Sequence, residues 1–219
     1  MKTDMAVLES FDETIVDSDL SGIPADLLEK SIDAIMEDGI LQSIPIVRTI
    51  AGAIKTAGNI QDRLFLNKIL SFLFHLKDVD PRQRQEMIND IDRSGIYQVR
   101  VGQKLLYIID KCDDHTKSAY VARIFKAFIQ RRISYPEFLR TVYAINNISS
   151  EDLQAFLQIP YGQDLDSVDC FYYTQAGLVK RLSGKEMQAI EGSRPGGYNV
   201  AAMFQIFSRE GEIIRQELR

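Results

Sequence analysis

The amino-acid sequence predicts a mainly α-helical protein, built as a multi-helix bundle that is followed by a smaller α+β region with a β-hairpin. Three observations support this prediction. Apolar residues recur at helical spacing over most of the chain up to residue 148. Proline and glycine interrupt that pattern where helices are expected to begin and end. Beyond residue 160 the pattern changes to short apolar runs separated by turn residues, which is typical of strands.

The helices of the first part are predicted from these signals in order. Residues 1–20 have weak periodicity and many acidic side chains, so they are expected to form a loosely ordered leader. Pro24 suits the first turn of the next helix, and Gly39 suits its end. Further helices are expected over 45–57, 60–77, 81–93 and 97–112, and after a cap at Asp114.

The remaining elements, from residue 136 onward, are further helices and a hairpin. One helix begins at Pro136, and Ser149 or Ser150 caps the next one. A short helix in DCFYYTQAG is expected to stop at Gly177. The strand LVKRL, a tip at GSRPGGYN, the return strand VAAMFQIF and a closing helix capped by Ser208 complete the order. The predicted domains are the leader 1–20, a helical bundle 21–148 and a C-terminal region 149–219.

The composition is that of a globular protein, but the charge is uneven along the chain. Of the 219 residues, 45% are hydrophobic and 26% are charged, well away from disordered compositions. The formal net charge is −5, yet residues 1–43 alone carry −9. Residues 44–79 carry +3 and residues 80–150 carry +4, while residues 151–219 carry −3. The sequence therefore pairs an acidic leader with a mildly basic body.

The most apolar segment, residues 44–77, also carries four basic side chains: Arg48, Lys55, Arg63 and Lys68. One interpretation makes this segment the central hairpin of the bundle, because its second helix is apolar over more than half of its circumference. The other makes it a conditional contact with a partner or an anionic membrane surface, which the acidic leader would screen. Its longest apolar run, about 13 residues, is too short to span a bilayer.

The sequence offers few groups for catalysis or metal binding. His75 and His115 are the only histidines and stand 40 residues apart, outside any metal-ligand spacing. The segment DKCDDH at 110–115 has three aspartates, but Asp114 is better explained as a helix cap. No nucleophile, phosphate-binding or dinucleotide motif occurs. We therefore expect no catalytic, cofactor-binding or metal-binding residues and no enzymatic activity.

The two cysteines and the first residues of the chain indicate the cellular compartment that is expected for the protein. Cys112 and Cys170 are far apart and lack metal-like spacing. The first residues are acidic rather than basic and then apolar, so they do not read as a secretory signal. A reducing cytoplasm, with peripheral membrane association as an option, is the expected location.

The C-terminal order of helices, hairpin and helix resembles a winged-helix domain over about 136–219. The segments YTQAGLVKRL and FQIFSREGEII carry this resemblance, because a glycine precedes a strand in the first and a strand runs into a helix in the second. The resemblance implies that SVDCFYYTQAG is the recognition helix, followed by the wing. That helix has no arginine or lysine, although helices that read a DNA groove use them. A version that binds protein is therefore favoured over one that binds nucleic acid.

The middle of the chain, with IPIV and DRLFLNKI, resembles uncharacterised small helical bacterial proteins without an assigned activity. This resemblance implies a bacterial or mobile-element origin, with phage or mobile-element defence as a possible setting. The leading hypothesis is a non-catalytic interaction or regulatory module, whose partner is another protein, a second copy or an anionic membrane. The alternative is a winged-helix regulator that binds nucleic acid through the basic residues of its wing region, Lys180, Arg181, Lys185 and Arg194.

Overall fold

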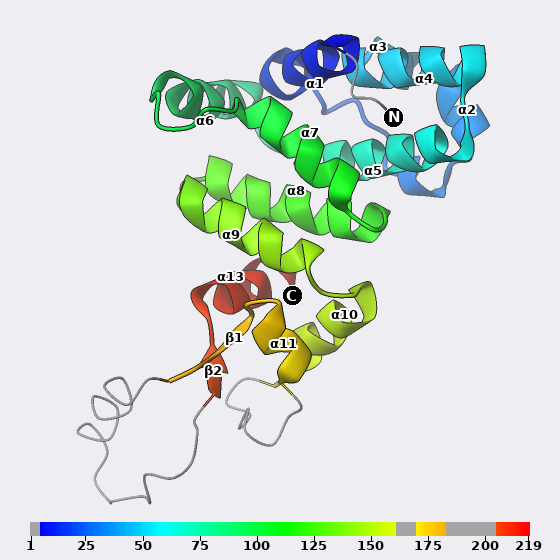
Figure 1. Cartoon of the computed structure of the whole chain (residues 1–219). Helices are drawn as coiled ribbons and strands as arrows, with labels where there is room; N and C mark the ends of the chain where they lie inside the picture. Colours follow the sequence, from blue (N-terminus) through cyan, green and yellow to red (C-terminus); the bar gives the residue numbers. More distant parts are fainter. Residues whose placement is uncertain (1–4, 161–169, 183–204) are drawn as a thin grey trace, which may run out of the picture. The chain divides into compact units, whose positions relative to one another are not determined.

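The computed structural model describes residues 5–160, 170–182 and 205–219, which divide into two compact units (Figure 1). The first unit is Met1–Tyr135 and the second is Pro136–Arg219. The described chain is mainly helical, as predicted, and its strands form one two-stranded antiparallel sheet. The division falls thirteen residues before the predicted boundary at 148/149 and therefore places the helix that begins near Pro136 in the second unit.

The first unit is built from helices whose ends follow local capping chemistry. Its elements are α1 (Met5–Asp17), the short 3₁₀ helix η1 (Leu27–Glu29), α2 (Ile32–Glu37), α3 (Gly39–Ser43), α4 (Pro45–Ala57), α5 (Ile60–Leu76), α6 (Pro81–Arg93), α7 (Val101–Lys111) and α8 (His115–Ile129). Asp80 and Asp114 cap α6 and α8 through their carboxylates, and the Asp114 cap was predicted above. Asn59 and Asp62 form a capping box at the start of α5.

The segment after Pro24 differs from the single helix that was predicted. Ser31 caps α2 by accepting a hydrogen bond from the Ala34 amide at 3.2 Å. Asp38 then caps α3 by accepting from the amides of Ile40 and Leu41. Gly39 is consequently the first residue of a helix rather than the end of one, because two capping side chains divide the segment.

The predicted leader is a docked helix over the described residues 5–17. The side chains of Phe11 and Ile15 on α1 are fully buried. The Thr14 hydroxyl accepts a hydrogen bond from the Ile46 amide at 3.1 Å, which ties α1 to the start of α4. α1 packs against α4, α6 and α7. This helix therefore belongs to the core of the first unit, because its apolar face is complementary to three other helices.

The segment 44–77 forms α4 and α5, and its apolar faces lie in the core of the first unit. The α5 side chain Phe72 contacts the Phe11 and Phe125 rings, with centroid distances of 6.2 Å and 6.0 Å. α5 packs most extensively against α8. Two reciprocal hydrogen bonds of 2.7 Å connect these helices, from Ser71 to the His115 carbonyl and from Ser118 to the Lys68 carbonyl. The apolar side chains of α4 and α5 are thus buried within the first unit, as the central-hairpin interpretation expects.

Arg84 on α6 is fully buried in the first unit and contacts the C-terminal end of α1. Its guanidinium donates to the carbonyls of Thr14, Ile15 and Ser18, at 3.3 Å, 2.8 Å and 2.5 Å. The Thr14 and Ile15 carbonyls belong to the last turn of α1, where no intrahelical donors remain, and Ser18 directly follows the helix. Burial lowers the pKa of Arg84, and the carboxylates of Asp19, Asp80 and Asp17 oppose that change. Arg84 therefore acts as a side-chain cap from another helix.

The second unit begins within α9 (Tyr135–Asn146), one residue after the start of that helix. α10 (Ser150–Gln158) follows and is capped by Ser149. The described chain continues with α11 (Phe171–Gln175), β1 (Val179–Arg181), β2 (Gln205–Phe207) and α13 (Arg209–Leu218). The predicted strands LVKRL and VAAMFQIF contain β1 and β2, which pair with Val179 opposite Phe207. Ser208 caps α13, as predicted. The predicted hairpin tip at 192–199 lies outside the described residues.

The core of the second unit is organised around Phe156 of α10. Its ring lies 5.2 Å from Tyr173 and 5.6 Å from Phe207, measured between centroids. Arg215 of α13 is buried, with its guanidinium 4.2 Å from the centre of the Phe207 ring. The Arg215 guanidinium also donates to the Phe156 carbonyl at 3.3 Å. In this unit too, an arginine from another helix thus donates to a carbonyl in the last turn of a helix.

Candidate functional site

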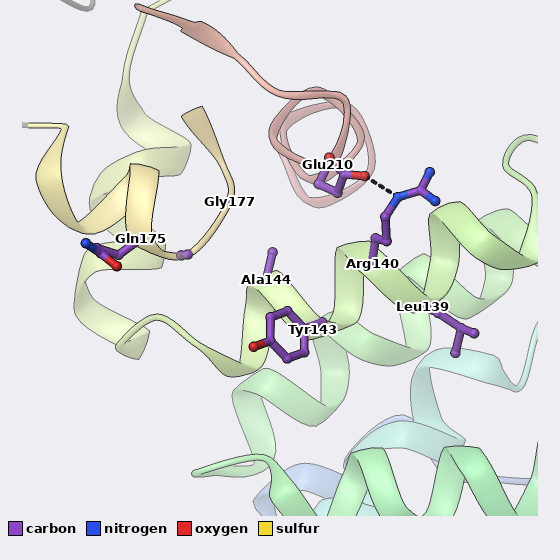
Figure 2. A pocket seen from close by; sticks show the side chains of 8 residues that line it. Leu139, Arg140, Tyr143, Ala144, Gln175, Gly177 and Glu210 are labelled. Atoms are coloured by element: carbon purple, nitrogen blue, oxygen red, sulfur yellow. Dashed lines mark hydrogen bonds and ion pairs between the residues drawn. The ribbon is translucent and has the colours of Figure 1, made fainter. Parts of the chain in front are cut away.

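An open pocket in the second unit lies between α9, the end of α11 and the start of α13 (Figure 2). Its cavity volume is about 480 Å³. The lining residues are Leu139, Arg140, Tyr143, Ala144, Gln175, Ala176, Gly177 and Glu210. These positions come from three segments that are distant in the sequence, so the tertiary fold creates the pocket.

Small residues leave the space that forms the pocket. Ala144 and Ala176 are buried and present only methyl groups. Gly177 follows α11 with φ of +81°, a left-handed conformation that favours glycine. The Ser208 hydroxyl donates to the Gly177 carbonyl at 2.5 Å and accepts from the Gly211 amide at 3.0 Å. One serine therefore fixes both the turn after α11 and the first turn of α13.

Two ion pairs connect α9 with α13 beside the pocket, and each helix supplies the arginine of one pair and the glutamate of the other. Arg140 donates to Glu210 at 2.7 Å, and Arg209 donates to Glu137 at 2.8 Å. The hydrogen bond to Glu137 raises the pKa of Arg209. Both arginines are largely exposed, so each pair contributes little to stability, about 0–1 kcal/mol. Their effect is to hold the two helices in register at the rim.

Tyr143 is the one aromatic residue among the pocket's lining residues, and it is 69% exposed. Figure 2 shows its ring beside Ala144, on the same side of α9 as Arg140. The Tyr143 hydroxyl and the Gln175 amide both donate and accept hydrogen bonds. The site therefore combines a small-residue surface, an aromatic ring and neutral polar groups, an arrangement that accommodates an apolar side chain together with a polar backbone.

The aromatic cluster CFYYTQ divides into buried and exposed parts. Tyr173 is buried against Phe156, whereas Phe171 and Tyr172 are 62% and 59% exposed. The Phe171 and Tyr172 rings lie edge to face, 5.4 Å between centroids. The exposed pair stands on α11, four and three residues before the pocket residue Gln175.

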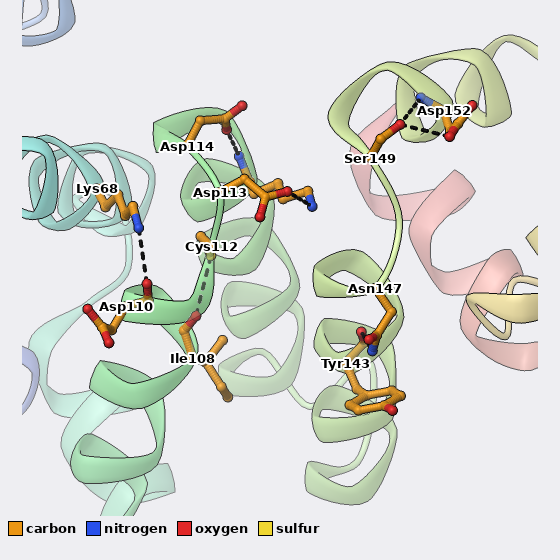
Figure 3. Close-up of polar contacts among 11 residues, drawn as sticks. Lys68, Ile108, Asp110, Cys112, Asp113, Asp114, Tyr143, Asn147, Ser149 and Asp152 are labelled. Carbon is orange, nitrogen blue, oxygen red and sulfur yellow. Dashed lines mark hydrogen bonds and ion pairs between the residues drawn. The ribbon is translucent and has the colours of Figure 1, made fainter. Parts of the chain in front are cut away.

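The four basic residues predicted on the 44–77 segment do not share one environment. Arg48 and Lys55 are exposed on α4. Arg63 on α5 is exposed and lies 3.4 Å from Asp33 of α2. Lys68 is half-buried and donates to the Asp110 carbonyl at 3.0 Å, at the end of α7 (Figure 3). One predicted contact residue is thus already engaged in the packing of α5 against α7.

The four residues predicted as nucleic-acid contacts are only partly described. Lys180 and Arg181 are exposed on β1. Lys185 and Arg194 lie outside the described residues. The short helix α11, which the winged-helix resemblance makes the recognition helix, exposes aromatic rather than basic side chains.

The DKCDDH aspartates serve the fold at the junction of α7 and α8 (Figure 3). Asp114 accepts from the Lys117 amide at 2.9 Å and caps α8, as predicted. Asp113 pairs with the buried ammonium of Lys117. Within the ranges that the structure describes, no group of three His, Cys, Asp or Glu side chains is arranged to hold a metal ion. No described helix is long and apolar enough to cross a membrane.

Cys112 is buried, and burial raises the pKa of its thiol to about 12. The thiolate is the reactive form, so the native chain should resist thiol reagents at neutral pH. In a Cys170→Ser variant, Cys112 is expected to react with Ellman's reagent only after urea unfolds the chain. Rapid stoichiometric labelling of this variant without urea would contradict the buried position of Cys112.

No family model matches the chain, and no curated protein or solved structure is significantly similar to it. The geometry of the molecule is therefore the basis for a functional conclusion.

The pocket residues were not selected from the sequence. Arg140 and Tyr143 occur in PEFLRTVYAI, which was recognised only as a helix. They stand three residues apart on its exposed side, opposite the buried Phe138 and Val142. A large aromatic on the polar face of an amphipathic helix is the signal that would have found Tyr143, because interfaces are enriched in exposed tyrosines.

Proposed function

We propose that this chain is a non-catalytic interaction protein whose second unit binds a peptide segment of a partner protein in the pocket between α9, α11 and α13. The observation that carries the proposal is the combination of a pocket surface formed by small residues with the exposed ring of Tyr143. An apolar side chain of the partner would occupy the space above Ala144 and Gly177. Tyr143 and Gln175 would bond to the partner's backbone.

The surroundings of the pocket support a polypeptide as the ligand. The rim presents both charges of the Arg140–Glu210 pair, which favours a partner of mixed polarity over a uniformly charged polymer. Phe171 and Tyr172 add exposed aromatic area on α11. Tyrosine and other aromatic residues dominate the binding energy of protein interfaces, which makes this surface suited to recognition.

Selection of peptides on the immobilised full chain tests the proposal. Selected peptides are expected to share one apolar anchor residue. Tyr143→Ala should weaken their binding by about tenfold or more, because an aromatic hot spot contributes upwards of about 1.4 kcal/mol. Ala144→Leu should weaken binding as well by filling the pocket. Affinities are measured by titration calorimetry, and circular dichroism checks that each variant is folded.

Tyr107→Ala is the matched control, because Tyr107 is an exposed tyrosine of the first unit. It should leave peptide affinity unchanged. The proposal fails if no peptide is enriched, or if enriched peptides bind Tyr143→Ala and Ala144→Leu as tightly as the parent chain.

A further inference from the structure

A cationic and aromatic stripe lies on the solvent side of α7 in the first unit. It consists of Arg100, Lys104, Tyr107 and Lys111, and this set is called the α7 stripe below. The spacings of four, three and four residues place these side chains on one face of the helix. At 1.5 Å per residue, Lys104 and Lys111 are separated by about 10 Å along the axis, with Tyr107 between them.

Tyr107 is 57% exposed, and two ammonium groups lie near its ring. The Nζ atoms of Lys104 and Lys111 both lie 5.7 Å from the ring centre. Lys68 adds a third ammonium group near the C-terminal end of α7, where it donates to the Asp110 carbonyl. Arg100 is 68% exposed at the other end, with Asp12 and Asp92 each 3.4 Å away. The Lys104 and Lys111 ammonium groups thus border a flat aromatic surface, whereas the charge of Arg100 is balanced by two carboxylates.

We propose that the α7 stripe binds single-stranded nucleic acid, with one base stacked on Tyr107 and the neighbouring phosphates on Lys104 and Lys111. Lys111 is exposed and Lys104 is half-buried. The exposed Lys111 side chain is flexible, so its ammonium group can leave the ring for a phosphate and make room for a base. Stacking of a base on an aromatic ring is stronger than an exposed cation–π contact, and the lysine gains a phosphate in exchange. Single strands suit this surface because their bases are free to stack.

The same face fits a membrane less well. The aliphatic side chains of α7, including Val101, Leu105 and Ile109, are buried in the first unit. The exposed positions of α7 are Gln103, Tyr107, Asp110 and Lys111, none of which is aliphatic. Binding in the interface of a bilayer scales with buried apolar area, of which this face offers only the Tyr107 ring.

Fluorescence anisotropy with a labelled oligothymidine of about 12 nucleotides tests the proposal on the full chain. Tyr107→Ala is expected to weaken binding by about tenfold to a hundredfold, without changing the salt dependence. The double variant Lys104→Gln/Lys111→Gln should reduce the slope of log affinity against log salt by about 1.4, because two phosphate contacts are lost. Tyr107→Phe keeps the ring and should bind like the parent chain.

Three controls separate this site from the others. Tyr143→Ala alters the pocket of the second unit and should leave oligonucleotide affinity unchanged, so this test is independent of the peptide proposal. Lys180→Gln/Arg181→Gln should also leave oligonucleotide affinity unchanged. Loss of binding in this variant would show that β1 contacts the oligonucleotide and would overturn the assignment to α7. Anionic vesicles of phosphatidylserine and phosphatidylcholine should not bind. Absence of oligonucleotide binding at low salt, or vesicle binding that depends on Tyr107 and both lysines, would contradict the proposal.

Discussion

Replacing Arg84 with methionine is expected to lower the free energy of unfolding by about 2–4 kcal/mol. The fully buried guanidinium donates to three carbonyls at the end of α1, those of Thr14, Ile15 and Ser18. Methionine fills the volume of the aliphatic stem but offers no donor, so these carbonyls lose their partners in a place that water reaches poorly. Removal of a desolvated charge offsets part of the loss, and for that reason the expected effect is smaller than the sum of three hydrogen bonds.

The measurement is urea unfolding followed by circular dichroism, together with hydrogen exchange of α1. In Arg84→Met, amides of the last turns of α1 should exchange faster than in the parent chain. Arg82→Met is the matched control, since Arg82 is exposed two residues earlier on α6, and its stability should change by less than about 0.5 kcal/mol. Equal stability and equal α1 exchange in Arg84→Met and the parent chain would show that Arg84 is not the cap of α1.

Replacing Gly211 with alanine is expected to destabilise the second unit by about 2–3 kcal/mol. A Cβ at this position would lie 2.1 Å from the Leu178 carbonyl oxygen and 3.2 Å from the Phe156 ring. The carbonyl is backbone and accepts from the Ser208 amide at 2.9 Å, so it cannot move aside without disturbing the start of α13. The expected sign is opposite to helix propensity, which favours alanine over glycine by about 1 kcal/mol.

Gly52→Ala is an informative control, because its expected change in stability is opposite in sign to that of Gly211→Ala. Gly52 is exposed on α4, and a Cβ there would meet no atom within 4 Å. Gly52→Ala should therefore stabilise the chain by about 0.5–1 kcal/mol, whereas Gly211→Ala should destabilise it. Thermal unfolding followed by circular dichroism measures the sign of the stability change in both variants. A stabilised Gly211→Ala variant would mean that α13 does not pack closely against the residue before β1.

Local chemistry explains which features were predictable from the sequence. Asp80, Asp114 and Ser208 cap their helices through bonds to amides two or three residues away, so a short window of sequence contains the whole interaction. The stop at Gly177 is equally local, because it depends on the backbone conformation of one residue. The mainly helical class follows from apolar spacing within each helix.

Long-range partners explain what the sequence did not reveal. α1 looked weakly periodic, and its docking depends on Arg84 and Ile46, which are distant in the chain. The helix predicted over 97–112 begins only at Val101, because the Asp92 carboxylate on α6 accepts from the Val101 amide at 2.8 Å and caps α7 from outside. The pocket likewise joins α9 to residues near Gly177 and Glu210, a combination that no local window contains.

Hydrogen exchange of the full chain with and without a selected peptide tests most directly whether the second unit is the contact surface. The account predicts that bound peptide slows exchange in residues 139–144, 175–177 and the first turn of α13, while residues 44–77 exchange as in the free chain. Slowed exchange concentrated in residues 44–77, with the pocket segments unchanged, would contradict it.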